Sequence, residues 1–446
     1  MPDTSSELEI WKTFRSWAKS NGAFIHPSLT FVPGTRGTSV MTTAEIPTNT
    51  TVLSCPFDLA ITYDLGIGVF KACIWEAAKI DSLSERQIVC AYIVLHWLER
   101  WSRTASHFRH QAYLDTLPHP DQLRTPLQFT PPEFELLKGT NLYGATEDRR
   151  KEWSTEWREV RDILADADKI WAEGFTWDRY LVAATYLSSR AFPSSLLSPA
   201  PTAQATSEDS YPVLLPVLDC LNHTRGLPVT WQVTSSPPTT ANGQSNINRS
   251  PLHIALLLRS TTPARSEVFN NYGPKPNSEL LLGYGFVIKS NPEDTIVLKL
   301  GGSEKRHEIS RDIDHSVQGG PISELWKEVE TMVLFSGEDD ASVTSLEGGW
   351  EVTLEVCEAL EDMLSRKMEA LPDAEAISKI TEPSIRQDVR DMIVEYVQGQ
   401  RDILKCLWDY VEERKREAIE LARASGLEVQ EVLEEDLEED MGNTSS

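Results

Sequence analysis

The chain has 446 residues, too many for one ordinary hydrophobic core, so we expect two or three domains. Its composition, 40% hydrophobic and 25% charged, is typical of a soluble globular protein and excludes a disordered one. A formal net charge of −26 argues against nucleic-acid binding and favours a basic protein as partner, because phosphate binding depends on Lys and Arg.

No apolar run is long enough to span a bilayer, and residues 1–6 lack the layout of a signal peptide. We therefore expect no membrane partner and a location in the cytoplasm, the nucleus or both. The six cysteines form no Cys-x-x-Cys pair, so the sequence predicts buried free thiols and no zinc site. They are Cys55, Cys73, Cys90, Cys220, Cys357 and Cys406.

The N-terminal part is predicted to form a helix and then a hairpin. Within residues 7–30, apolar side chains recur at steps of three and four, which favours an amphipathic helix. Residues 33–37 have the composition of a turn. The β-prone segments 38–43 and 51–55, separated by Pro47-Thr48-Asn49, are predicted to pair as a hairpin.

The middle of the chain is predicted to be helical from about 65 to 190, with a Pro-rich connector at 118–132. Two polar segments, 198–210 and 234–250, have the composition of surface loops. Strand-like runs lie between and after them, so β structure is expected on both sides of a large helical insertion. These runs are 213–216, 229–233 and 253–258.

The C-terminal part is predicted to be a helical bundle. Residues 295–300 are interpreted as a strand that closes or leaves the first domain. An apolar stripe from Val389 to Val411 then favours a long packed helix. Residues 428–440 carry acids with no compensating base, so we expect a frayed or disordered tail.

Several separated stretches, taken in order, resemble the SET-domain protein lysine methyltransferases of the Rubisco large-subunit methyltransferase-like class. Each stretch alone is weak, and their order makes the series specific. An Asn-His pair by itself is equally a capped turn, and Tyr272 a tyrosine packed at the end of a strand. The stretches are Arg36-Gly37 with Ala44-Glu45-Ile46, Ser189-Arg190-Ala191-Phe192, Leu218-Asp219-Cys220-Leu221-Asn222-His223, residues 267–273, Asn277 with Glu279-Leu280-Leu281, and Tyr284-Gly285-Phe286.

This resemblance implies an α+β fold, with a SET core of small β-sheets and a chain crossing called the pseudoknot. The SET domain would cover residues 1–290, with its core at about 20–64 and 185–290 and a helical insertion at about 65–184. An all-α domain of the substrate-binding type would cover 291–427, and an acidic disordered tail 428–446. The protein is expected to be a monomer that acts on a protein substrate.

The resemblance also implies that the chain binds S-adenosylmethionine and no metal. Cofactor contacts would come from main-chain atoms near the first turn, from the Asn-His pair, and from an aromatic side chain. The implied residues are Gly34, Thr35, Arg36, Asn222, His223 and Phe286. One departure stands out, because Thr35-Arg36-Gly37 replaces the usual Gly-x-Gly, which strains the loop if its first position needs a positive φ. Phe286 could instead be ordinary core packing.

Tyr272 is the implied catalytic residue, with Arg190, Asp219 and Tyr284 at the substrate. Methyl transfer to lysine needs a neutral amine, and deprotonating a free lysine at pH 7 costs about 4.6 kcal/mol. Desolvation beside a positive sulfonium lowers that cost, and a tyrosine hydroxyl can orient the amine. Arg190 and Asp219 could equally form a structural ion pair.

Other functions are weighed against this one. A degenerate SET fold acting as a protein-binding module is supported only by the displaced glycine, and a histidine acceptor is possible within the enzyme class. A Rossmann-type enzyme needs a Gly-rich strand-to-helix turn, and Gly66-Ile67-Gly68 has no preceding strand. A metal hydrolase could use His107 and His110, but no acidic partners accompany them and a solvated pair is expected.

Overall fold

The structure, a computed structural model, describes residues 7–34, 37–73, 80–98, 107–198, 210–235, 252–311, 320–336 and 349–426. Thr35, Arg36 and the predicted acidic tail lie outside the described residues. The chain divides into two compact units, and each is described by itself. The first unit comprises Met1–Phe129, Gly144–Lys275 and Glu279–Phe286, and the second comprises Thr130–Tyr143, Pro276–Ser278 and Val287–Ser446.

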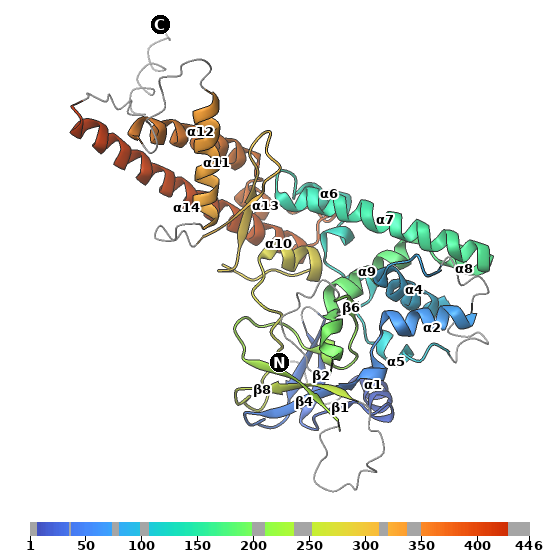
Figure 1. Cartoon of the computed structure of the whole chain (residues 1–446). Coiled ribbons are helices and arrows are strands. Elements are labelled where there is room, and N and C mark those ends of the chain that lie inside the picture. Colours follow the sequence, from blue (N-terminus) through green and yellow to red (C-terminus); the bar gives the residue numbers. More distant parts are fainter. Residues whose placement is uncertain are drawn as a thin grey trace. The chain divides into compact units, whose positions relative to one another are not determined.

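The first unit contains a four-stranded antiparallel sheet with strand order β1-β4-β8-β7. Its inner strands β4 and β8 are almost entirely buried, and β8 is an apolar run after His253. Figure 1 shows helix α1 (Glu9–Ser20) close to this sheet, and its Trp11 ring stacks on Phe31 with centroids 4.3 Å apart. The strands are β1 (Phe24–Ile25), β4 (Thr50–Pro56), β7 (Val229–Thr234) and β8 (His253–Leu258).

The predicted hairpin between residues 38–43 and 51–55 is wrong. Strand β3 (Gly37–Thr42) instead pairs with β2 (Leu29–Gly34), with Gly34 opposite Gly37. After β3 the chain leaves this pair, because Ile46 bridges to Thr262 and the following β4 joins the other sheet. Pro33 and Gly34 are typical turn residues, so the sequence gives no clear signal for β2. Its Leu29 and Phe31 are buried in alternation, as in a strand.

The chain between β4 and β6 (Pro212–Val213) is mainly helical, and one part of it, Thr130–Tyr143 with helix α6 (Pro131–Glu135), belongs to the second unit. Its central helix α4 (Glu85–Leu98) is buried continuously from Gln87 to His96, as expected for a helix that is apolar all round. Gly66 lies inside α2 and not in a strand-to-helix turn, and a Cβ there would be 2.5 Å from Cγ2 of Ile88, so glycine allows α2 to approach α4. The longer helices of the insertion are α2 (Tyr63–Cys73), α4, α7 (Asn141–Ala167) and α9 (Trp177–Arg190), with short α5 (Gln111–Leu114), α6 (Pro131–Glu135) and α8 (Lys169–Gly174).

Two short helical elements carry motif residues, one before β7 and one after β8. The 3-10 helix η6 (Leu218–Cys220) precedes the Asn-His pair. The π-helical turn η7 (Leu280–Tyr284) follows α10 (Asn277–Glu279) and ends at Gly285, whose φ is +78°. A Cβ on Gly285 would lie 2.9 Å from the carbonyl carbon of Arg124, so both its conformation and its surroundings require glycine.

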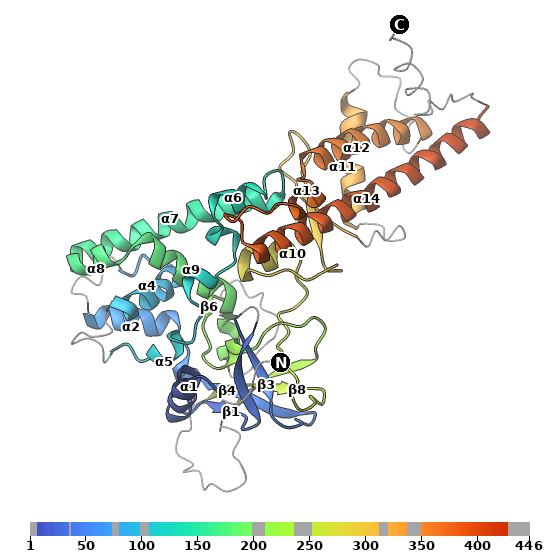
Figure 2. The ribbon, with the colours of Figure 1, turned by 180° about the vertical axis from the view of Figure 1, so that it is seen from behind.

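The second unit is a two-stranded antiparallel pair with a helical bundle. Strand β9 (Thr295–Leu298) pairs with β10 (His307–Ser310) in this unit, so the strand predicted within 295–300 forms outside the first unit, and the domain predicted to be all-α from residue 291 also contains a pair of strands. The long helix α14 (Gln387–Ala424) buries the predicted stripe that includes Val389 and Val411. Figure 2 shows α12 and α14 running alongside each other. The remaining helices are α11 (Pro321–Ser336), α12 (Trp350–Ala370) and α13 (Ala374–Ser378).

None of the helices in the described part of the chain is both long and apolar enough to cross a membrane.

Candidate active site

The Asn-His pair and the Tyr272 segment, far apart in sequence, are hydrogen-bonded neighbours in the first unit. His223 and Asn270 form a parallel β-bridge. The Asn270 amide donates to the carbonyl of Asn222 at 2.8 Å, and the Thr224 amide donates to the carbonyl of Asn270 at 3.0 Å.

The segment that leads into Tyr272 is also bound on its other side. The Val268 amide donates to the carbonyl of Val40 at 2.8 Å, and Met41 bridges to Glu267 in antiparallel fashion. Residues 267–270 therefore join β3 to the Asn-His turn through main-chain bonds. The position of this segment depends little on its individual side chains.

His223, Tyr272 and Tyr284 form an aromatic column. The His223 and Tyr272 rings stack with centroids 5.0 Å apart, and the Tyr272 and Tyr284 rings with centroids 5.3 Å apart. Phe286 meets the edge of Tyr284 at 6.2 Å and lies at the same distance from His223. Four of the residues that the sequence suggested for the site are thus in one cluster.

Hydrogen bonds fix the protonation of the column. The amide of Tyr272 donates to Nδ1 of His223 at 3.0 Å, so that nitrogen carries no proton. Burial, and then the positive charge of Lys275, lower the pKa of His223 below 6.5, so the ring is neutral at physiological pH.

The Tyr272 hydroxyl donates to the carbonyl of Leu221 at 2.7 Å. Burial raises the pKa of this hydroxyl well above its ordinary value. Tyr272 therefore keeps its proton at neutral pH and can act as an oriented hydrogen-bonding group, but not as a base. The oxygen lone pairs that remain are available to a second donor.

Arg190 and Asp219 form the ion pair that the sequence offered as a structural alternative. Nη1 of Arg190 lies 3.5 Å from Oδ2 of Asp219 and donates to the Asp219 carbonyl at 3.0 Å. Burial raises the pKa of Asp219 above 3.8, while Arg190 opposes that shift. Burial alone would lower the pKa of Arg190, but Asp219 more than offsets it, so the guanidinium stays charged.

Two further residues of this region carry no sequence signal. Tyr113 of α5 is buried and donates its hydroxyl to Oδ2 of Asp219 at 2.6 Å. Lys275 forms an ion pair with Glu279, and its ammonium lies 5.6 Å from the centroid of the Tyr284 ring. Neither residue belongs to a motif: the fold brings Tyr113 to Asp219, whereas Lys275 follows Tyr272 by three residues along the chain.

The residues proposed for cofactor contacts are partly described. Gly34 ends β2, and a Cβ there would lie 2.8 Å from Oγ of Ser39, so the main chain at this turn tolerates no side chain without a shift. Asn222 is exposed, and its amide nitrogen donates to Oε1 of Glu267 at 2.7 Å and to the Thr38 carbonyl at 3.2 Å. Thr35 and Arg36 lie outside the described residues.

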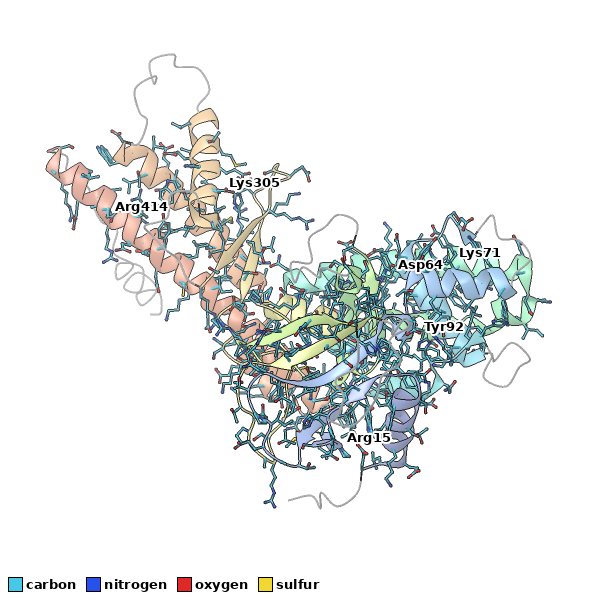
Figure 3. The ribbon with its side chains drawn as sticks, turned by 60° about the horizontal axis from the view of Figure 1, so that its bottom comes forward. Arg15, Asp64, Lys71, Tyr92, Lys305 and Arg414 are labelled. Carbon is cyan, nitrogen blue, oxygen red and sulfur yellow. The ribbon has the colours of Figure 1, made fainter. Side chains whose placement is uncertain are left out.

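The expectation of a solvated His107 and His110 pair is wrong for His110. This side chain is fully buried, with Nδ1 2.7 Å from the Tyr92 hydroxyl and Nε2 3.0 Å from the Leu59 carbonyl. Figure 3 marks Tyr92 within the helical part of the first unit. His107 is exposed, and the described residues contain no group of three or more His, Cys, Asp or Glu side chains that could hold a metal ion.

Comparison with known proteins gives relatives and a fold. No family model matches the chain. Over 313 residues it is 29% identical to ribosomal lysine N-methyltransferase set10 of Schizosaccharomyces pombe, covering 69% of this chain and 50% of the relative. It is 26% identical to protein-lysine N-methyltransferase EFM1 of Saccharomyces cerevisiae, covering 64% of this chain and 51% of the relative. The chain spans about half the length of these relatives.

The SET domain of LSMT bound to MeLysine and AdoHcy superposes with a TM-score of 0.70 at 17% identity, covering 98% of this chain and 100% of that one. The chain therefore has this SET fold, and the predicted α+β class with helical extensions is confirmed. The predicted resemblance to SET-domain lysine methyltransferases of the Rubisco class is confirmed as well, in sequence similarity and in fold.

Proposed function

We propose that this chain, with the SET fold of Rubisco large-subunit methyltransferase and sequence similarity to yeast lysine methyltransferases, is an S-adenosylmethionine-dependent protein lysine methyltransferase. The observation that carries the proposal is the position of Tyr272. Its hydroxyl donates to the Leu221 carbonyl, and its ring stacks between those of His223 and Tyr284. Activity, substrate and partners are proposed for this chain because it matches only about half of each relative.

The residues present fit S-adenosylmethionine. Asn222 has an exposed amide beside the His223 main chain, and the turn at Gly34 leaves main-chain groups free of a shielding Cβ. These neutral polar groups are suited to bind the amino-acid and adenine portions of S-adenosylmethionine. When bound, the cofactor supplies an electrophilic methyl group on a sulfonium. The site residues are Gly34, Thr35, Arg36, Asn222, His223 and Phe286 for the cofactor, and Arg190, Asp219 and Tyr284 for the substrate.

The chain's own residues would bind and orient the amine. Tyr272 keeps its proton, so it orients the amine by hydrogen bonding, and the amine proton leaves to water. Tyr284 offers an aromatic wall to the aliphatic stem of a lysine. Burial around Tyr272 and Asp219 removes water from the reacting amine, which lowers the cost of its neutral form.

For the substrate we propose a basic protein, and a ribosomal protein as the class to test first. The net charge of −26 favours a basic partner through long-range attraction, and the relative set10 is named a ribosomal lysine methyltransferase. We further propose that the protein is a monomer and acts in the cytoplasm or the nucleus, with no nucleic acid or membrane as partner.

The test is methyl transfer from radiolabelled S-adenosylmethionine into an extract of cells that lack this protein. Wild type should label a discrete protein band, and Tyr272→Phe should label it at least about 100-fold more slowly, as for loss of a group that orients the reactants. Tyr180→Phe serves as control, because Tyr180 is also buried but donates to Glu156 in the insertion.

Equal labelling by wild type and Tyr272→Phe would contradict the role of Tyr272. No labelling by wild type, with S-adenosylmethionine bound or not, would favour a binding module over an enzyme.

A further inference from the structure

Helix α5 is anchored by a buried histidine that the proposed chemistry does not use. The amides of Tyr113 and Leu114 donate to the carbonyl of His110 at 3.0 and 2.9 Å, so His110 begins the helix. His110 is in turn bound to Tyr92, His96 and the Leu59 carbonyl. Burial lowers the pKa of His110 to about 3, so these bonds do not change over the physiological pH range.

Tyr113, one turn after this anchor, connects α5 to the candidate site. It is 1% exposed, and its hydroxyl bond to Asp219 is 2.6 Å long. A hydrogen bond to a buried carboxylate is among the stronger side-chain interactions in a protein. Tyr113 and Arg190 both contact Oδ2 of Asp219, and together they hold its carboxylate in position.

The turn that carries Asp219 is strained. Val217, immediately before η6, has φ +80° and ψ −45°, which a β-branched side chain rarely adopts, and it is fully buried. Such a conformation persists only where its surroundings determine it. Asp219 lies two residues after Val217. Its side-chain contacts with Tyr113 and Arg190 hold the η6 turn in place.

This turn sets the acceptor of the candidate catalytic hydroxyl. Leu221 follows Asp219 by two residues, and its carbonyl accepts the Tyr272 hydroxyl at 2.7 Å. A displacement of η6 would therefore move the oxygen that orients Tyr272. Within the described part of the chain, Tyr113 makes no hydrogen bond or ring contact with His223 or Tyr272, so its influence is transmitted through Asp219.

We propose that Tyr113 is a positioning residue for methyl transfer, which holds Asp219 and with it the Leu221 carbonyl that orients the Tyr272 hydroxyl. This inference rests on the proposed function. It adds a residue of the helical insertion that no motif indicates, and it assigns to α5 the task of supporting the site.

The chain offers a matched control for this proposal. Tyr180 of α9 is also buried and donates its hydroxyl to a carboxylate, Oε2 of Glu156, at 2.9 Å, and that carboxylate also pairs with Arg86. Tyr180→Phe removes the same hydroxyl from a bond to a carboxylate, but Glu156 lies on α7 and, within the described residues, makes no hydrogen bond to the aromatic column.

The experiment compares wild type, Tyr113→Phe and Tyr180→Phe in steady-state methyl transfer, with S-adenosylmethionine affinity measured by calorimetry. We expect kcat to fall about tenfold in Tyr113→Phe, and to stay within about twofold of wild type in Tyr180→Phe. The Kd for S-adenosylmethionine should stay within about twofold in both variants, because the main-chain bonds of the Asn-His turn remain.

Equal kcat for Tyr113→Phe and wild type would overturn the inference, and so would an equal loss in both variants, since that would reflect stability alone. Failure of the proposed function gives a different result, because wild type itself would then transfer no methyl group. An active wild type with two unaffected variants rejects only the role of Tyr113.

Discussion

The first unit contains two clusters of the same composition, each made of a buried tyrosine, a carboxylate and an arginine. One joins Tyr113, Asp219 and Arg190, and the other joins Tyr180, Glu156 and Arg86. Tyr180 and Arg190 stand near opposite ends of the same helix, α9. The difference lies in what each carboxylate is attached to.

Glu156 lies in the middle of the long helix α7, where its position is already fixed by helix geometry. Asp219 lies in a three-residue 3-10 turn next to a strained valine, where side-chain contacts must fix the backbone. The same three side chains can therefore stabilise a helical bundle in one place and position a reactive group in another. Their composition alone does not tell the two apart.

The largest difference between the clusters is expected on removal of the arginine. Arg190→Met leaves Asp219, whose side chain is 2% exposed, as a buried unpaired charge, and should lower the free energy of unfolding by about 3 kcal/mol. Arg86→Met should lower it by only about 1 kcal/mol, because the Glu156 side chain is 17% exposed and water can solvate it. Urea unfolding measures both values.

Methyl transfer should fall in Arg190→Met and persist in Arg86→Met. A loss of stability as large in Arg86→Met as in Arg190→Met would mean that the burial of the carboxylate does not distinguish the two clusters.

Removal of the tyrosine hydroxyl should make the clusters look alike in stability. Tyr113→Phe and Tyr180→Phe each delete one hydrogen bond to a carboxylate, and each should lower the free energy of unfolding by about 2 kcal/mol. The two values are read from urea unfolding curves. If Tyr113→Phe were much the less stable of the two, its lower kcat could no longer be assigned to positioning.

The smallest expected effect is a pH dependence that comes from Asp219. Burial raises the pKa of its carboxyl above 3.8 in the folded state. Such a group contributes stability below its unfolded pKa, and that contribution is lost as the pH rises through the folded pKa. Wild type should therefore lose free energy of unfolding relative to Asp219→Asn as the pH rises from 3.8 through this raised pKa.

Unfolding curves for wild type and Asp219→Asn, taken at a series of pH values across that window, give the change of the free energy of unfolding with pH for each protein. A difference that grows in the opposite direction, with wild type gaining stability, would show that Arg190 dominates and that the pKa of Asp219 is depressed.

The resemblance to SET-domain methyltransferases indicates His223, Tyr272, Tyr284 and Phe286 as site residues, and the structure brings their rings into one cluster. The stripe of α14 and the apolar run of β8 were equally readable, because burial on one face or both faces leaves a periodic signal.

What could not be read from sequence depends on contacts between distant segments. The partner of β3 was missed because Pro33 and Gly34 made β2 look like a loop. His110 was taken for a solvated residue, because nothing local shows that Tyr92 and the Leu59 carbonyl surround it. Tyr113 gave no signal, since a buried tyrosine in a helical block has the same sequence context whether or not it meets a carboxylate.

The proposed function requires methyl transfer to a lysine at the aromatic column that contains Tyr272. The most direct measurement is the identity of the labelled amino acid after complete hydrolysis of the protein that wild type labels with radioactive S-adenosylmethionine. We predict that the label is recovered as methylated lysine with wild type and is lost with Tyr272→Phe. Recovery of the label as methylated histidine, or full labelling by Tyr272→Phe, would contradict lysine methyl transfer at Tyr272.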